Sequence, residues 1–141
     1  MIKIKEARNE DLEWVNATYS SIKFLPSSLK DEIVAIAYES DQKFGLGRIS
    51  VIDDKSCELG GMYVDPKYRR RGIARDIVTY LLENAQKSKV YCIPFLHLEH
   101  FYASFGFKRI NEGVSIPTKI AKKFQFCKET YAEETILMVR E

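Results

Sequence analysis

The sequence lacks several features that would place it in a common class of protein. Its three cysteines are an odd number and form no CxxC pair, which argues against a disulfide framework or a zinc site. No apolar run approaches the roughly 20 residues of a membrane span, and the N-terminus has no apolar core of signal-peptide length. We therefore expect a cytoplasmic protein with reduced cysteines, no membrane partner and no metal site.

The sequence also has little net charge and none of the common nucleotide-binding loops. A formal charge of +2 gives no reason to expect a nucleic-acid partner. Neither GxxxxGK[ST] nor GxGxxG is present. The length of 141 residues is that of one domain and is sufficient to bury a sizeable core. We therefore expect a single domain over residues 1–141.

What the sequence does contain is an apolar strand, a basic turn and an amphipathic helix in succession over residues 59–82. Backbone N–H groups in the first turn of a helix have no partner within the helix, and together with the helix dipole they bind phosphate well. Gly72 leaves the backbone open to a close approach. Five basic residues surround it: Lys67, Arg69, Arg70, Arg71 and Arg75. The turn therefore predicts a site for a compact polyanion.

The spacing of this turn resembles the acetyl-CoA pyrophosphate loop of the GCN5-related N-acetyltransferases, the GNAT family. The family pattern V-x-P-x-x-[QR]-x-x-G-x-[GA] is matched at every specified position from Val64 to Ala74. A second stretch, Phe101 to Phe107 (FYASFGF), is similar to the family's [LF]-Y-x-x-x-G-F signature. The resemblance implies an acyl-CoA-dependent N-acyltransferase that uses acetyl-CoA as donor and no metal. It covers roughly the whole chain, but only these two stretches carry specific motifs.

The expected order of helices and strands is also that of the GNAT family. Apolar periodicity predicts strands at residues 2–7, 32–39, 44–52, 57–64, 90–93, 107–110 and 135–140, and helices at 10–22, 73–86, 96–104 and 117–128. Asn9 is the expected N-cap of the first helix, and a short helix is expected to start at Pro26. The resemblance implies an α/β (α+β) fold. Its central sheet is mixed and mostly antiparallel, with six to seven strands and about four flanking helices.

The resemblance also implies a proton donor. In the family, the tyrosine of the second motif lies beside the CoA sulfur, which makes Tyr102 the group that protonates the departing thiolate. A phenol has a pKa near ~10 and a thiol near ~8.5, so the proton can move between them. A second interpretation is that the Tyr102 ring simply packs in the core.

The sequence offers several candidates for the base that deprotonates the amine. A primary ammonium has a pKa near ~10 and must lose a proton before it attacks a thioester. Glu58 stands six residues before Val64, where some histone-acetylating members of the family carry a glutamate base. Other members use a chain of water molecules, and Glu58 could equally be a surface carboxylate. His97 and His100 have a suitable ordinary pKa near ~6.5, but they could equally be surface side chains.

The remaining contacts to the cofactor are implied by the resemblance alone. The pyrophosphate is expected on the basic turn, and the pantetheine arm on backbone groups at the end of the preceding strand. The expected contact residues are Met62, Tyr63, Val64, Arg69, Arg70, Arg71, Gly72, Ile73, Ala74 and Arg75. Phe95 departs from the family, because many members have an asparagine seven residues before the tyrosine. This departure puts cofactor contacts on that side in question.

Two other functions fit parts of the sequence. A non-catalytic acyl-CoA-binding domain, acting as a sensor or regulatory partner, would keep the turn and dispense with Tyr102 and Glu58. A nucleic-acid-binding module would use the arginine run and the aromatic residues, but the net charge is low and the aromatics are scattered.

The partner that accepts the acyl group is expected to be an amine of a small molecule or a protein. Lys119, Lys122 and Lys123 of the last helix are expected to form a solvated face, although they could instead favour an acidic substrate. The resemblance also implies that the chain can form a homodimer.

Overall fold

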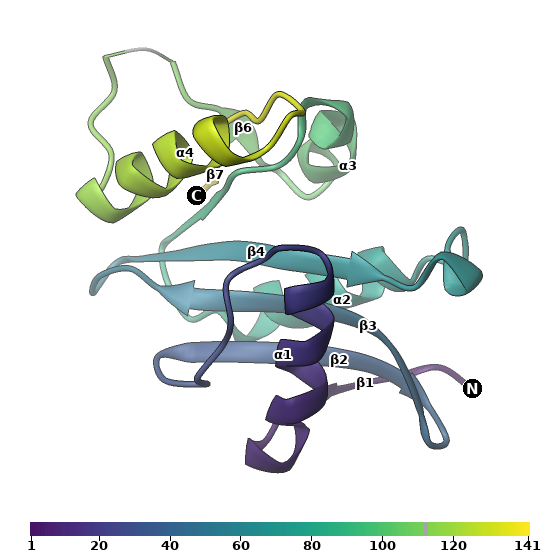
Figure 1. The fold of residues 1–141 in the computed structure, drawn as a ribbon. Coiled ribbons are helices and arrows are strands. Elements are labelled where there is room, and N and C mark those ends of the chain that lie inside the picture. The colour runs from purple at the N-terminus through teal and green to yellow at the C-terminus, as the bar shows by residue number, and fades with distance from the viewer. Residues whose placement is uncertain (112) are drawn as a thin grey trace. The chain divides into compact units, whose positions relative to one another are not determined.

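The computed structural model describes residues 1–111 and 113–141. In these residues, seven strands form one mixed sheet in the order β1-β2-β3-β4-β5-β7-β6, and four α-helices accompany them (Figure 1). The predicted fold class is therefore confirmed. Contacts divide the chain into two compact units, which we describe separately: unit 1 covers residues 1–50 and 61–86, and unit 2 covers residues 51–60 and 87–141. A single domain over residues 1–141 remains a prediction.

Unit 1 is built on antiparallel strands β1 (Lys3–Glu6), β2 (Glu32–Glu39) and β3 (Gln42–Val51). Helices α1 (Leu12–Ser21) and α2 (Ile73–Asn84) pack on opposite faces of these strands (Figure 1). Because the strands are covered on both faces, β2 is a nearly continuous apolar run, EIVAIAYE, rather than an alternating one.

The two faces of unit 1 are packed in different ways. On the α1 face, Val34 and Ile36 of β2 join one apolar cluster with Tyr19. On the α2 face, β3 presents glycines. A Cβ built on Gly47 would lie only 2.6 Å from Ile77 Cγ2 of α2. The two glycines of β3, which weaken the strand prediction, are therefore what allows α2 to pack closely on the sheet.

Unit 2 contains the start of β4 (Ser56–Val64), which runs parallel to β5 (Lys89–Cys92). Strand β7 (Met138–Arg140) pairs antiparallel with β5 and with β6 (Lys108–Arg109). Two helices complete the unit, α3 (Glu99–Ala103) and α4 (Thr118–Thr130). Its apolar cluster is centred on Tyr91, Ile120 and Leu137.

Three predicted details at the ends of elements are wrong. Asn9 does not cap the first helix, because it begins a 3₁₀ turn (Asn9–Asp11) in which the Asp11 carboxylate accepts a hydrogen bond from the Arg8 backbone N–H. The predicted helix at residues 96–104 is a 3₁₀ turn (Leu96–Leu98) followed by the short α3. The last strand is shorter than predicted, since only an isolated bridge joins Thr135 to Phe95, and Pro94 beside it has no N–H for a regular ladder.

The short helix expected from Pro26 is also wrong. Residues 23–31 form turns, with positive φ angles at Lys23, Leu29 and Asp31. Ser27 is held by Asn16 of α1, whose side-chain amide donates to the Ser27 carbonyl (2.9 Å) and accepts from the Ser27 N–H (2.8 Å). These bonds satisfy the Ser27 backbone groups that a helix would use. Across the described ranges, no helix is both long and apolar enough to cross a membrane.

Candidate functional site

The predicted anion-binding turn connects β4 to α2 in unit 1. After Val64 the chain forms a 3₁₀ turn (Pro66–Tyr68), in which the Asp65 carboxylate accepts a hydrogen bond from the Lys67 N–H at 2.9 Å. The Asp65 N–H donates to the Phe44 carbonyl at 2.8 Å, and the Phe44 and Tyr68 rings stack with centroids 4.0 Å apart. These contacts fasten the start of the turn to β3.

The turn ends at an open helix N-terminus. Gly72 is the N-cap of α2 and adopts a left-handed conformation with φ 75°. Having no side chain, it does not cap the helix, and a Cβ placed on it would meet nothing within 4 Å. Arg70 also has a positive φ, of 67°. Left-handed residues among successive amides form concavities that bind anions, so the backbone here is shaped for a phosphate group.

The arginines of the turn are exposed around this open end. Arg69 donates from Nε to the Val64 carbonyl at 3.1 Å, and the Arg71 guanidinium lies over the Tyr68 ring at 5.2 Å. Arg70 and Arg75 are likewise exposed. The structure therefore places the cofactor residues predicted in the turn on one continuous segment, with the helix dipole and the formal charges acting at the same place.

The end of β4, where Met62, Tyr63 and Val64 lie half-buried, is preceded by a break in the strand geometry. Gly61 has a φ of 60°, which only glycine adopts readily. The Tyr19 hydroxyl donates to the Gly61 carbonyl at 2.9 Å, and a Cβ on Gly61 would lie 2.6 Å from that hydroxyl oxygen. Tyr19 and Gly61 therefore set the direction in which the end of β4 runs after the break.

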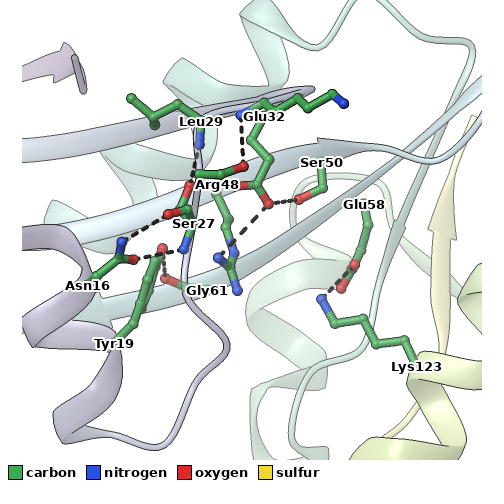
Figure 2. A network of polar contacts seen from close by, with 12 residues as sticks. Asn16, Tyr19, Ser27, Leu29, Glu32, Arg48, Ser50, Glu58, Gly61 and Lys123 are labelled. Carbon is green, nitrogen blue, oxygen red and sulfur yellow. Dashed lines mark hydrogen bonds and ion pairs between the residues drawn. The ribbon is translucent and has the colours of Figure 1, made fainter. Parts of the chain in front are cut away.

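A buried arginine supports this arrangement (Figure 2). Arg48 of β3 is only 6% exposed, and its guanidinium lies 4.5 Å from the centroid of the Tyr19 ring. Its counterion is Glu32, at 4.0 Å, whose carboxylate also accepts hydrogen bonds from the hydroxyls of Ser27 (2.5 Å) and Ser50 (2.8 Å). Burial raises the pKa of Tyr19 far above its usual value, so the phenol keeps its proton and remains a donor.

In unit 2, the candidate base Glu58 is buried and paired. It is 4% exposed, and Lys123 of α4 donates a hydrogen bond from Nζ to Glu58 Oε1 at 2.7 Å (Figure 2). The predicted solvated face of α4 is therefore wrong at Lys123, although Lys119 and Lys122 are exposed as expected. The interpretation of Glu58 as a surface carboxylate is also wrong, because β4 carries it into the interior of the unit.

The candidate acid Tyr102 is also buried. It lies on α3 and is 5% exposed, with the rings of Phe101 and Phe107 edge-on at 5.0 and 5.9 Å. Burial, with a smaller contribution from Cys92, raises the pKa of the Tyr102 phenol well above its usual value. Tyr102 is therefore fully protonated at neutral pH and available as a donor, as well as packed against its neighbours.

The cysteines of unit 2 are protonated thiols. Burial raises the pKa of Cys57 to about 11. Burial also holds the pKa of Cys92 well above its usual value, with the charge of Glu58 adding to the effect. Burial also raises the pKa of Cys127, against the opposing charge of Lys123. A thiolate is the nucleophilic form of cysteine, so none of these three groups is suited to carry an acyl group.

Other residues singled out from the sequence lie at the surface or in contacts of their own. His97 and His100 are exposed, and His97 Nδ1 lies 3.5 Å from a Glu133 carboxylate oxygen. Phe95 packs edge-on against Tyr131 with centroids 5.7 Å apart. In the described part of the chain, no three His, Cys, Asp or Glu side chains are grouped so that they could hold a metal ion.

Sequence reasoning missed Arg48, Gly61 and Lys123. The sequence does contain two signals. The pair of glycines in β4 indicates unusual backbone geometry in that strand, and a single arginine stands out in the apolar β3. Lys123 carries no comparable signal, because its partner lies 65 residues away in the chain.

Comparison with known proteins identifies the family. The protein-family sequence model described as acetyltransferase (GNAT) domain matches residues 30–109. The uncharacterized N-acetyltransferase YedL of Escherichia coli K12 is 39% identical over 62 residues, which are 44% of this chain and 37% of that protein. The chain therefore matches little more than a third of the length of this relative.

Solved structures show the same fold. N-acetylglutamate synthase from Neisseria gonorrhoeae, complexed with coenzyme A and N-acetyl-glutamate, superposes with a TM-score of 0.79 at 14% identity, over 99% of this chain and 35% of that one. Rv2747 from Mycobacterium tuberculosis, in complex with CoA and NLQ, gives 0.75 at 20% identity over 98% of both chains. Escherichia coli ElaA gives 0.73 at 19% identity over the full length of both.

Proposed function

The chain belongs to the GNAT acetyltransferase family, and from this premise we propose that it transfers an acetyl group from acetyl-CoA to a primary amine by direct attack on the thioester. The observation that carries the proposal is the open, left-handed N-terminus of α2 at Gly72, surrounded by exposed arginines. We further propose that residues 1–141 act as one domain.

Donor binding would use unit 1. The pyrophosphate would accept hydrogen bonds from the backbone N–H groups at Ile73 and Ala74, with the arginines of the turn neutralising its charge. The pantetheine arm would pair with backbone groups of Met62 to Val64. The left-handed Gly61 supports this role, because it breaks the regular strand geometry just before these residues.

The chemical step would use Glu58 and Tyr102 of unit 2. An acceptor ammonium gives a proton to the Glu58 carboxylate, and the free amine attacks the carbonyl carbon. The C–N bond forms, the C–S bond breaks and the CoA thiolate leaves. The attacking nitrogen loses its second proton as the acceptor becomes an amide, which balances the proton that the thiolate takes up. The buried position of Glu58 supports this role, since a carboxylate out of bulk water interacts strongly with a nearby ammonium.

Tyr102 would act at the leaving sulfur. Because burial raises its pKa, full transfer of its proton to a thiolate is less favourable than it is for an exposed tyrosine. A hydrogen bond from the phenol to the sulfur still stabilises the charge that develops in the transition state. Tyr102 would therefore contribute mainly by donating a hydrogen bond to the sulfur. The thiolate would take up its proton as CoA leaves the site.

The acceptor class is an amine of a small molecule or a protein. Two of the similar structures, the N. gonorrhoeae synthase and Rv2747, contain N-acetyl-glutamate and NLQ together with CoA. Identities of 14% and 20% show a shared fold and not a shared substrate. We choose amino acids as the first acceptors to screen because one of these structures contains N-acetyl-glutamate.

The test is thermal unfolding with and without acetyl-CoA. A ligand at one hundred times its Kd adds about 2.7 kcal/mol of stability, which raises the midpoint by several degrees. We expect this rise with acetyl-CoA and none with ATP or NAD. Release of free CoA in the presence of amines would then show turnover. Binding without release for any amine would favour the non-catalytic sensor, and no binding at saturating acetyl-CoA would overturn the proposal.

A further inference from the structure

Lys123 is placed differently from the other lysines of α4. It falls on the same face of the helix as Ile120 and Cys127, which are buried, because the three lie at spacings of three and four residues. Its side chain is 30% exposed, whereas Lys119 and Lys122 are exposed. The packing of the helix therefore directs the Lys123 amine inward, toward Glu58.

The amine lies directly on the proposed base. Lys123 Nζ is 2.7 Å from Glu58 Oε1, and Glu58 is buried (Figure 2). Gly60, two residues further along β4, has no side chain. A Cβ there would lie 3.2 Å from Glu58 Oε2 and 4.0 Å from Lys123 Nζ. The pair is therefore formed at a position where the strand leaves space beside the two charged groups.

We propose that Lys123 is a modification site, acylated in cis by the donor that the same chain binds. This inference rests on the proposed function, because it requires bound acetyl-CoA and Glu58 as the base. An acceptor ammonium must come within hydrogen-bond distance of the base before it can lose its proton. Lys123 already meets this condition in the structure.

The reaction is balanced without any further reagent. The Lys123 ammonium gives a proton to Glu58, and the amine attacks the thioester carbonyl. The C–N bond forms and the C–S bond breaks, leaving an amide on Lys123 and CoA as leaving group. The attacking nitrogen loses its second proton as the amide forms, which balances the proton that the CoA thiolate takes up, and Glu58 returns its own proton to solvent. Acylation removes the positive charge of Lys123, so that Glu58 loses its counterion and its carboxylate is available to an outside ammonium.

The experiment measures acylation at individual lysines by mass spectrometry after incubation of the purified chain with acetyl-CoA and no added amine. Lys122 is the matched internal control, since it is the next residue toward the N-terminus on the same helix and is more exposed. Spontaneous acylation favours exposed amines, so it would label Lys122 first. We expect Lys123 to be labelled at least about tenfold faster than Lys122, because a positioned base contributes this much or more. The rate constant should not change when the protein is diluted tenfold.

Variants separate the base from general reactivity. Glu58→Gln should slow labelling of Lys123 by on the order of a hundredfold and leave Lys122 unaffected. Lys122→Arg should leave labelling of Lys123 unchanged, and Lys123→Arg should abolish the fast phase. Circular dichroism establishes whether Glu58→Gln folds. If it does not fold, the unaltered chain still tests the proposal. The ratio of the labelling rates of Lys123 and Lys122 tests the site, and the dilution series tests acylation in cis.

Failure of the inference differs from failure of the proposed function. If acetyl-CoA binds and CoA is released to added amines, but Lys123 is labelled no faster than Lys122, the modification site is overturned and the acyltransferase stands. A rate constant that rises in proportion to protein concentration would overturn acylation in cis. If acetyl-CoA neither binds nor is consumed, both fall together.

Discussion

At the scale of single residues, Gly61 is the position where the backbone leaves ordinary strand geometry. Its positive φ and its carbonyl contact with Tyr19 were not derivable from periodicity, because a strand pattern assumes one conformation throughout. Gly72 serves a different purpose, since the space around it is empty. Two glycines with similar φ angles therefore have different roles, one in packing and one in leaving an approach open.

This difference gives a prediction about stability. Gly61→Ala should lower the free energy of unfolding by about 2–4 kcal/mol, because a left-handed alanine costs roughly 1–2 kcal/mol and the added methyl group is forced against Tyr19. Gly113→Ala is the matched control, since Gly113 also has a positive φ but no atom within 4 Å of the added Cβ. Urea unfolding measures both. Equal losses would show that Tyr19 moves aside freely.

A second prediction at this scale concerns Tyr102. Tyr102→Phe should preserve the affinity for acetyl-CoA and lower kcat by on the order of a hundredfold, because only the hydroxyl donor at the leaving sulfur is removed. Tyr91→Phe is the control, as it removes a hydroxyl from another buried tyrosine of unit 2. Steady-state kinetics with a thiol reagent measure both variants. An unchanged kcat in Tyr102→Phe would assign the thiolate proton to solvent or to another group.

At the scale of elements, what could be predicted depends on how local the determining contacts are. The strand, turn and helix from β4 to α2 follow from adjacent residues, and the structure places them as the sequence indicates. The segment at residues 23–31 depends on Asn16, eleven residues from Ser27, and its predicted helix is wrong. The Glu58–Lys123 pair depends on the packing of α4, so no local pattern indicated it.

The turn before α2 gives the third prediction. Gly72→Glu should raise the Kd for acetyl-CoA at least about a hundredfold, since like charges about 4 Å apart near a surface repel by about 4 kcal/mol. The variant should remain folded, because its left-handed conformation costs only roughly 1–2 kcal/mol and a Cβ at this position meets no other atom within 4 Å. Isothermal titration calorimetry gives the affinity, and circular dichroism gives the fold.

Two further variants separate charge from bulk and from location. Gly72→Gln introduces a side chain of similar size without the charge, and Thr79→Glu places the same charge on an exposed position of α2 further along the helix. We expect Gly72→Gln to weaken binding less than Gly72→Glu, and Thr79→Glu to bind normally. Normal binding by Gly72→Glu would mean that the pyrophosphate is not held at this helix terminus.

At the scale of the whole molecule, the distribution of two residue types allows the two units to be observed separately. Trp14, the only tryptophan, lies in unit 1, and all three cysteines lie in unit 2, where they are buried. Tryptophan fluorescence therefore follows the unfolding of unit 1. Reaction of the thiols with a fast reagent follows unit 2, because burial and the raised pKa values protect them in the folded state.

The fourth prediction is that the two probes give the same transition. A single cooperative domain unfolds in one step, so fluorescence and thiol exposure should have the same urea midpoint and the same slope. Strand β4 contributes residues to both units, which is a physical reason for them to unfold together. Two separated midpoints would show that residues 1–141 do not form one domain. Early reaction of Cys127 alone would instead show local opening of α4, the helix that holds Lys123 on Glu58.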